Sequence, residues 1–147
     1  MSSGFLLDTS VLSMLAPNKP APDETLAIWV RNHADRIFLS AVTIAEIEQG
    51  ICKLRRAGGE MRADRLSHWL DSLLDAESTQ ILALDGKVGR VAGGLSDRAI
   101  AAGRHPGFPD VAIAATAIAH DMILVTRNGK HFEPLDVAFI DPRDGLP

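Results

Sequence analysis

Short, continuous apolar segments alternate with longer segments of helical periodicity along this chain of 147 residues. Apolar segments this short are typical of strands buried on both faces of a parallel sheet. The expected strands are Gly4–Asp8, Ile37–Leu39, Ile81–Leu84, Ile123–Val125 and Val137–Ile140. Because helical segments separate them, the sequence predicts one α/β domain over residues 1–147, with a central, mostly parallel sheet and helices on both faces.

Two helical segments, Thr43–Arg56 and Glu60–Asp75, carry apolar stripes and are separated by Gly58-Gly59, which predicts an antiparallel helical hairpin. The other helices are expected at Val11–Leu15 (ended by the Pro17–Pro22 stretch), from Asp23 with Asp23 or Thr25 as cap, between Asp85 and Gly103, and at Asp110–His120. Four glycines in the segment after Asp85 disfavour a helix energetically, and we expect them to mark close packing: Gly86, Gly89, Gly93 and Gly94.

The charge balance excludes one mode of nucleic-acid binding. Fifteen Lys and Arg against 19 Asp and Glu give a net charge of −4, so a broad cationic surface for duplex nucleic acid is not expected. With no Tyr and only two Trp, extended base stacking is also not expected. An acidic cluster that holds Mg²⁺ still presents a local positive centre to phosphates, so nucleic acid remains a possible ligand.

The cellular location follows from what the sequence lacks. Cys52 is the single cysteine, which precludes an internal disulfide, and its apolar helical surroundings predict a buried thiol. The first residues lack the basic segment of a secretory signal, and no apolar run approaches the roughly 18 residues of a membrane span. We therefore expect a soluble protein of the cytoplasm that makes no contact with a membrane.

Polar side chains follow the buried strands. Asp8 ends the first strand, Glu46 lies within a few residues of the second, and Thr126-Arg127-Asn128 follow Val125. Asp110 begins a helix that is apolar nearly all round, so its position relative to the sheet should be fixed. Because ligands of open α/β sheets bind beyond the carboxyl ends of the strands, we expect these groups to meet there.

Three converging carboxylates need a cation, because like charges at close range raise one another's pKa. Mg²⁺ and Mn²⁺ prefer oxygen ligands, and Mg²⁺ commonly combines a few carboxylates with substrate phosphates. Such an ion activates water and neutralises phosphate charge, so the pattern predicts metal-assisted hydrolysis.

Four segments in order, FLLDTSVLS, LSAVTIAEIEQGI, PDVAIAATA and ILVTRNGKHFE, resemble the PIN-domain ribonucleases, specifically the VapC and FitB-like toxins of bacterial toxin–antitoxin pairs. The resemblance covers almost the whole chain. It implies a Mg²⁺- or Mn²⁺-dependent endoribonuclease with Asp8, Glu46 and Asp110 as its acidic site. It also implies a homodimer inhibited by a cognate antitoxin.

The last segment departs from the family pattern. Many relatives place further acids roughly where this chain has Asn128 and His131. Ser10 is expected to orient Asp8, and Thr126 and Asn128 to support the metal shell. Arg127, Lys130 and His131 are candidate RNA contacts, and His131 is also a candidate proton carrier.

Each acidic residue also has a purely structural interpretation. Asp8 could cap the helix that follows it, Thr43 and Glu46 form a capping-box pattern, and Asp110 suits the dipole of its helix. Asp85 also follows an apolar segment, and we interpret it as a helix cap. A further open question is the basic group in the hairpin, a solvated face or an RNA contact: Lys53, Arg55, Arg56, Arg62 and Arg65.

Two rival functions remain. Since the loop after Val125 lacks acids, the chain could be a binding module that keeps the fold and the antitoxin interface without catalysis. An aspartyl-phosphate phosphatase also places a nucleophilic Asp after its first strand. That class needs a second Asp two residues later, where this chain has Ser10.

Overall fold

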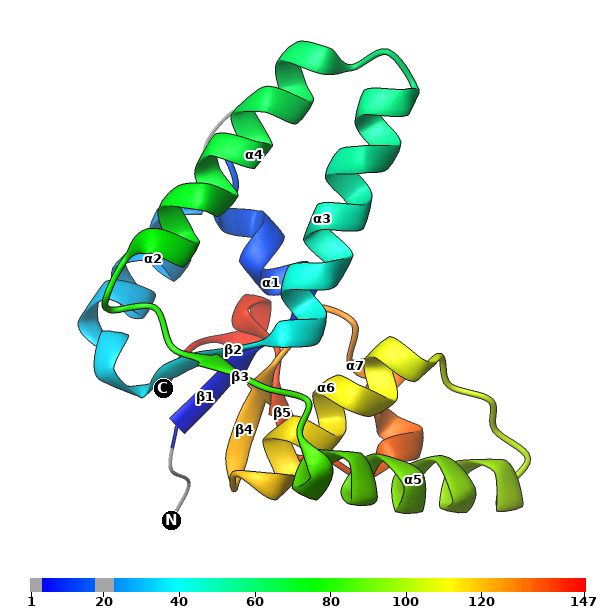
Figure 1. Ribbon diagram of the computed structural model, residues 1–147. Coiled ribbons are helices and arrows are strands. Elements are labelled where there is room, and N and C mark those ends of the chain that lie inside the picture. The colour runs from blue at the N-terminus through cyan, green and yellow to red at the C-terminus, as the bar shows by residue number, and fades with distance from the viewer. Residues whose placement is uncertain (1–3, 18–22) are drawn as a thin grey trace.

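A computed structural model describes residues 4–17 and 23–147, so all of the Pro17–Pro22 stretch except Pro17 lies outside the described residues. The described chain forms one five-stranded sheet in the order β3-β2-β1-β4-β5, and all four strand pairs are parallel (Figure 1). The strands are β1 (Gly4–Leu7), β2 (Ile37–Ser40), β3 (Ile81–Leu82), β4 (Met122–Val125) and β5 (Phe139–Ile140).

The register brings the carboxyl ends of the central strands together. Leu7 at the end of β1 pairs with Leu39 of β2 and with Val125 of β4, and Val125 pairs with Ile140 of β5. The residue after each strand therefore emerges at one edge of the sheet. Asp8 emerges at the middle of that edge, since β1 is the central strand.

Helices follow the strands in the predicted alternation. The α-helices of the described residues are α1 (Thr9–Leu12), α2 (Glu24–Asn32), α3 (Ala41–Arg56), α4 (Glu60–Asp75), α5 (Gly86–Ala101), α6 (Phe108–Ala119) and α7 (Gly129–Phe132). Short 3₁₀-helices are η1 (Ser13–Leu15), η2 (Ala34–Arg36), η3 (Glu133–Leu135) and η4 (Pro142–Asp144). Of the two candidate caps for α2, Asp23 is the one whose side chain accepts from the Leu26 N–H.

Alternate residues of each strand enter two separate cores, one on each face of the sheet. Leu6 of β1 packs in the core made with α5, α6 and η3, whereas Phe5 and Leu7 pack in the core made with α1, α2, α3 and α4. The predicted α/β fold with helices on both faces is confirmed.

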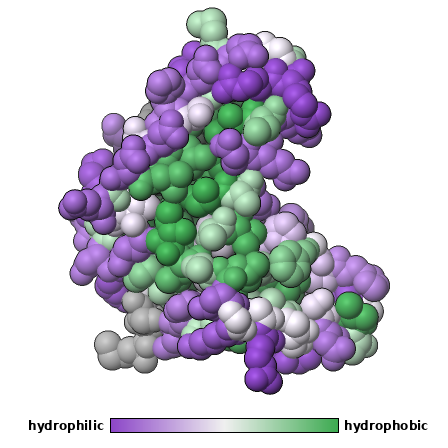
Figure 2. Space-filling view, in the orientation of Figure 1, coloured by the Kyte–Doolittle hydropathy of each residue, from purple (hydrophilic) through white to green (hydrophobic). Residues whose placement is uncertain are grey.

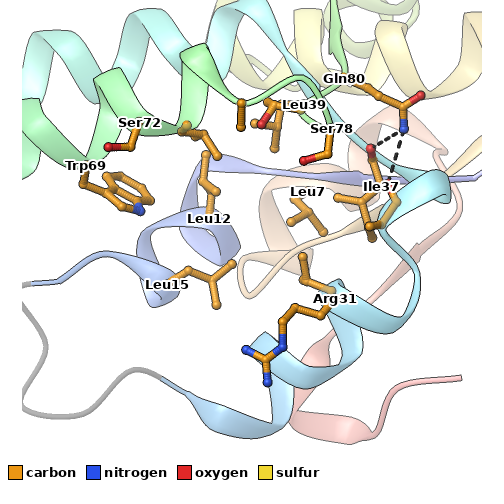
Figure 3. A pocket seen from close by; sticks show the side chains of 15 residues that line it. Leu7, Leu12, Leu15, Arg31, Ile37, Leu39, Trp69, Ser72, Ser78 and Gln80 are labelled. Atoms are coloured by element: carbon orange, nitrogen blue, oxygen red, sulfur yellow. Dashed lines mark hydrogen bonds between the residues drawn. The ribbon is translucent and has the colours of Figure 1, made fainter.

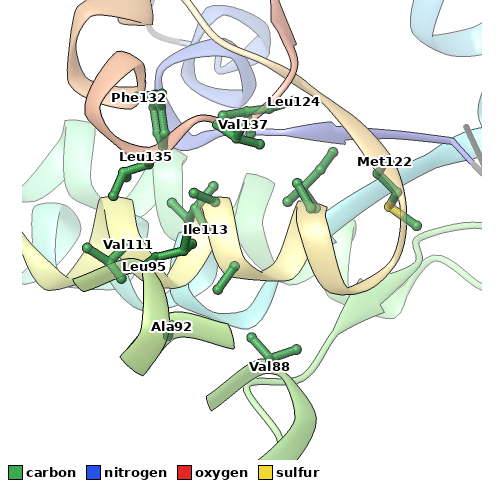
Figure 4. Close-up of a cluster of buried hydrophobic side chains, with 14 of the residues drawn as sticks. Val88, Ala92, Leu95, Val111, Ile113, Met122, Leu124, Phe132, Leu135 and Val137 are labelled. Atoms are coloured by element: carbon green, nitrogen blue, oxygen red, sulfur yellow. The ribbon is translucent and has the colours of Figure 1, made fainter. Parts of the chain in front are cut away.

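Helix α6 is the most deeply buried helix among the described residues. Seven consecutive residues, Val111 to Ala117, are buried. Its side chains pack against Val88, Ala92 and Leu95 of α5 and against the strand side of the same core (Figure 4). Full burial of a Val or Ile side chain contributes about 1.5–3 kcal/mol, so this helix holds its first turn, with Asp110, firmly against the sheet.

Helices α3 and α4 lie side by side and form the predicted hairpin, which projects from the sheet (Figure 1). Its far end is mostly hydrophilic, and apolar side chains gather where it meets the rest of the molecule (Figure 2). Near the turn, the guanidinium of Arg55 bonds Glu60 at 2.9 Å and Asp64 at 2.8 Å. Exposed pairs of this kind contribute about 0–1 kcal/mol each, so apolar packing is the main support of the hairpin.

Two expectations about packing are wrong. Cys52 is exposed, because α3 turns Ile47 and Ile51 towards the core and the face carrying Cys52 towards solvent. The glycines of α5 do not mark close packing either. A Cβ atom added at Gly86, Gly89 or Gly93 would meet nothing within 4 Å, so α5 packs through its apolar residues.

The two outer strands of the sheet are shorter than expected. Ile81–Leu84 contributes only two residues, Ile81–Leu82, and Val137–Ile140 only Phe139–Ile140. Apolar residues follow β3 at Ala83-Leu84 and precede β5 at Val137-Ala138, so apolar composition alone does not mark the ends of an outer strand. No helix in the described part of the chain has the length and hydropathy needed to cross a bilayer.

Candidate functional site

Asp8 is buried, with 4% of its surface exposed, and caps α1. Its Oδ1 accepts from the Val11 N–H at 3.1 Å and from the Ser10 hydroxyl at 2.6 Å. Its Oδ2 accepts from the Thr126 hydroxyl at 2.6 Å. An ionised carboxylate has about four acceptor positions, so one remains on Oδ2. The capping interpretation is therefore correct, and it leaves a position on Asp8 for a cation.

The loop after β4 is bonded directly to Asp8. Thr126 is fully buried; its hydroxyl donates to Asp8 and accepts from the Asn128 N–H at 2.9 Å. The Ser10 hydroxyl in turn accepts from the Arg127 N–H at 3.1 Å. These bonds join segments separated by more than a hundred residues and hold the Asp8 carboxylate in one orientation.

Glu46 is not part of a capping box. Helix α3 begins at Ala41, with Ser40 as its N-cap, so Glu46 lies in the second turn, not the expected first. Its Oε1 accepts from the Thr9 hydroxyl at 2.6 Å, and Thr9 Oγ1 also lies 3.2 Å from the hydroxyl of the buried Thr43. Glu46 is thus held towards β1 by the residue that directly follows Asp8.

Asp110 lies in the first turn of α6 with 30% of its side chain exposed, and its Oδ2 is 3.5 Å from Nδ1 of His131. Burial raises the pKa of the Asp110 carboxyl. The charge of His131 opposes that rise, and the negative charges of Glu46 and Asp8 add to it. The three carboxylates are therefore close enough to influence one another electrostatically.

One pocket of about 390 Å³ receives all three carboxylates. It is lined by Asp8, Thr9, Ser10, Ser13, Glu46, Asp110, Ile113, Asn128 and His131. Of the residues that the sequence placed at this edge of the sheet, Asp8, Glu46, Asp110 and Asn128 line the pocket, together with Ser10. Thr126 lies behind Asp8 and does not line the pocket.

The donor set of this pocket fits a hydrated hard cation. Within residues 4–17 and 23–147, no group of three or more His, Cys, Asp or Glu side chains is arranged closely enough to hold a metal ion by itself. Mg²⁺ does not require such a cage, because it usually keeps several waters and binds through one or two carboxylates. Asp8, with its open acceptor position on Oδ2, and the partly exposed Asp110 could supply those ligands.

Other candidates lie outside the pocket. Asp85 caps α5 through the Val88 N–H at 3.0 Å, as expected for a structural residue. Arg127 is exposed and does not line the pocket, whereas Lys130 lines a neighbouring one with His131. In the hairpin, Lys53 and Arg62 line a groove that also includes Glu46.

Two residues of the surrounding network were missed. Thr9 donates to Glu46, and its position directly after Asp8 is the sequence feature that could have identified it as a site residue. Arg143 donates through Nη2 to the Arg127 carbonyl at 3.0 Å and to Asp141 at 2.6 Å, which ties the last 3₁₀-helix to the loop after β4. Arg143 keeps the pKa of the Asp141 carboxyl below its usual value. No local pattern connects Arg143 with that loop.

A separate apolar cavity of about 410 Å³ lies among α1, α2, α4 and β2 (Figure 3). Leu7, Leu12 and Leu15 point into it, and the amide of Gln80 closes one side by donating to the Ile37 carbonyl at 3.0 Å. Its lining contains no carboxylate, so this cavity does not offer the oxygen ligands that Mg²⁺ prefers.

Residues 5–137 match the PIN domain. The VapC ribonuclease Y4jK of Sinorhizobium fredii is 30% identical over 139 residues, which cover 94% of this chain and 96% of that protein. FitAcB from Neisseria gonorrhoeae has a similar structure, with a TM-score of 0.77 at 28% identity, covering 97% of this chain and 99% of that one. VapBC-5 from Mycobacterium tuberculosis, a member of the VapBC family of toxin-antitoxin systems, gives a TM-score of 0.65 at 28% identity, covering 95% and 97%.

The chain belongs to the PIN-domain family, because the match spans most of its length and the fold agrees. The resemblance inferred from the four sequence segments is therefore confirmed, and so is the single α/β architecture. The similar proteins thus include a VapC ribonuclease, the toxin FitB of Neisseria gonorrhoeae and a member of the VapBC family of toxin-antitoxin systems.

Proposed function

We propose that this protein is a metal-dependent endoribonuclease toxin that hydrolyses RNA phosphodiester bonds and is neutralised by a cognate antitoxin. The main support is the pocket in which Asp8, Glu46 and Asp110 meet. The similar VapC ribonuclease supports RNA as substrate, and the similar VapBC-5 system supports an antitoxin partner. We further propose a cytoplasmic homodimer.

Bound Mg²⁺, or Mn²⁺ in its place, would neutralise charge on the phosphate and make water a stronger nucleophile. Asp8 and Asp110 would bind the ion directly, and Glu46 directly or through water. Ser10 and Thr126 orient Asp8, and Thr9 orients Glu46. Asn128 lines the same pocket and can hydrogen-bond to a water within it.

Asp8→Asn tests this proposal. Asn caps helices as well as Asp does, so the fold should survive while Mn²⁺-stimulated cleavage of RNA by the antitoxin-free protein falls to background. Growth arrest on expression should also be lost. Asp85→Asn is the matched control, because it changes an aspartate that caps α5 outside the pocket. Undiminished cleavage by the Asp8→Asn protein would defeat the assignment.

A second candidate is a binding module that keeps the antitoxin interface but has lost catalysis. The loop after β4 favours it, because Asn128 and His131 stand where many relatives have acids, and both line the pocket. Absence of metal-stimulated cleavage of any RNA by freshly purified protein that still binds its antitoxin would favour this candidate.

A further inference from the structure

A second pocket, of about 340 Å³, adjoins the carboxylate pocket, and we call it the cationic pocket after Arg104 and Lys130 in its lining. Arg104 and His105 line it from the loop between α5 and α6, and Lys130 and His131 line it from α7. Asp110 and His131 also line the carboxylate pocket, so the two pockets share a wall. A ligand that extends beyond the three carboxylates on this side enters the cationic pocket directly.

The basic side chains of Arg104 and Lys130 and the imidazole of His105 are available to a ligand. Arg104, His105 and Lys130 are exposed, and no side-chain hydrogen bond or ion pair of these three is found within the described residues. By contrast, Arg55 and Arg143 are engaged by acidic partners in the same chain. Asp110 is the one acid in the lining of the cationic pocket. A protein with net charge −4 therefore concentrates unpaired positive charge beside its candidate catalytic carboxylates.

Both sides of the cationic pocket are anchored by the fold. The Arg104 N–H donates to the Ala99 carbonyl at 2.8 Å, which fixes the start of the loop at the end of α5. On the other side, Phe132 of α7 is fully buried. Gly129 allows α7 to lie against β5, because a Cβ there would stand 2.5 Å from the Phe139 ring. The backbone positions of Arg104 and Lys130 relative to Asp110 are thus set by packed elements.

We propose that this cationic pocket binds a backbone phosphate of the RNA strand next to the phosphate that is cleaved. The inference rests on the proposed nuclease function. Arg and Lys are the usual partners of phosphate oxygens, and such contacts position a strand without reading its sequence. Arg104 and Lys130 are positioning residues in this scheme.

Binding without cleavage tests the pocket most directly. In the Asp8→Asn protein, we would measure the affinity for a fluorescent, mixed-sequence RNA 12-mer between low and moderate salt. Each phosphate contact contributes about 0.7 to the slope of log K against log salt for single strands. Arg104→Ala together with Lys130→Ala should reduce the magnitude of this slope by about 0.7, because the pocket is proposed to hold one phosphate. Arg90→Ala removes an exposed charge of α5 outside both pockets and should leave the slope unchanged.

Kinetics and phosphate binding give independent readouts. In the protein with Asp8 intact, the Arg104→Ala/Lys130→Ala variant should raise KM about tenfold or more and leave kcat nearly unchanged. Inorganic phosphate, titrated in EDTA, should shift the imidazole NMR signals of His105 and His131 but not those of His68. Circular dichroism melting shows whether each variant is folded. If the double variant unfolds, the single Lys130→Ala variant and the phosphate titration still test the pocket.

The outcomes separate this inference from the nuclease proposal. Cleavage by the unaltered protein combined with equal salt slopes for the double variant and Arg90→Ala overturns the phosphate pocket and leaves the nuclease standing. A lowered slope combined with no metal-stimulated cleavage supports the pocket and overturns the nuclease. RNA binding that is undetectable in every variant, together with no cleavage by the unaltered protein, overturns both.

Discussion

The two aspartates of the pocket are held in opposite ways. Asp8 is buried and accepts three hydrogen bonds, from Ser10, Val11 and Thr126. Asp110 is partly exposed, its side chain pairs with His131 at 3.5 Å, and its pKa is raised by burial and by neighbouring carboxylates. The Asp8 side is thus organised by the protein itself, whereas a cation would relieve the repulsion on the Asp110 side.

Replacing each aspartate by asparagine gives the largest effects and tests the contrast directly. Both variants should lose RNA cleavage, but their stabilities should move in opposite directions. Asp8→Asn loses hydrogen bonds to a charged group and should destabilise the metal-free protein by about 1–3 kcal/mol. Asp110→Asn removes a carboxylate that burial disfavours and should raise stability. Urea unfolding at pH 7 in EDTA measures both, and a shift of the same sign in both variants would break the contrast.

Asp110→Asn should also differ from the unaltered protein in its response to metal. At a Mn²⁺ concentration about 100 times Kd, binding stabilises a protein by about 2.7 kcal/mol. The unaltered protein should show an increase in Tm with Mn²⁺, and Asp110→Asn should show little. Asp85→Asn should respond as the unaltered protein does, because Asp85 lies outside the pocket. An equal metal response in all three proteins would exclude Asp110 as a ligand.

Thr126→Val tests whether the hydrogen bonds that hold Asp8 support the site. It removes the donor to Asp8 and the acceptor of the Asn128 N–H, which should cost about 1–3 kcal/mol of stability. Loss of such a supporting contact should also reduce activity about 10–100-fold. Thr116→Val is the matched control, since Thr116 is equally buried but its hydroxyl bonds only the Ala112 carbonyl of its own helix. Equal activity in both variants would remove Thr126 from the site.

Arg143→Gln should have a smaller effect, because it acts through the backbone of the loop after β4. Losing the bond to the Arg127 carbonyl should lower kcat by less than about tenfold, a 1.4 kcal/mol change in barrier, with little effect on KM. Steady-state cleavage rates measure this. Arg98→Gln, on the exposed face of α5, is the control for loss of a charge. If the two variants behave alike, the last 3₁₀-helix does not support the site.

The smallest effect is on the pH dependence of stability in EDTA. The pKa of Asp110 is raised on folding, so the folded state binds its proton more readily than the unfolded state does. The contribution of Asp110 to the free energy of unfolding therefore falls as pH rises from the unfolded pKa of about 3.9 through the raised folded value. The stability of the unaltered protein minus that of Asp110→Asn, both measured by urea unfolding at each pH, isolates the contribution of Asp110. The difference should decline with pH in that window, and a rise would contradict the raised pKa.

Much of the fold could be predicted because burial leaves a direct trace in the sequence. The apolar segment before Asp8 and the nearly uniform apolar face of Val111–Ala117 both identified elements that the structure buries. The sequence pattern is less informative at the outer strands and on the solvent-facing sides of helices. Leu84 extended an apolar segment past the end of β3, and Cys52 lies on the outer face of a helix whose inner face is apolar.

The carboxylates themselves could be identified from the sequence, but their roles could not. For Glu46, the spacing from Thr43 suggested a capping box, and only the observed start of α3 at Ala41 removed it. Asp8 met both descriptions at once, as a helix cap and as a pocket residue. The partners Thr9 and Arg143 depend on contacts between distant segments.

By itself, the sequence determined that short buried strands alternate with helices and that acids follow some of those strands, because hydrophobic periodicity and residue order are local properties. Tertiary structure decided which polar side chains face one another. The parallel register puts Asp8 beside Thr126, and the packing of α6 and α7 puts Asp110 beside His131, between the carboxylate pocket and the cationic one. Those relations arise only when segments far apart in the chain share one core.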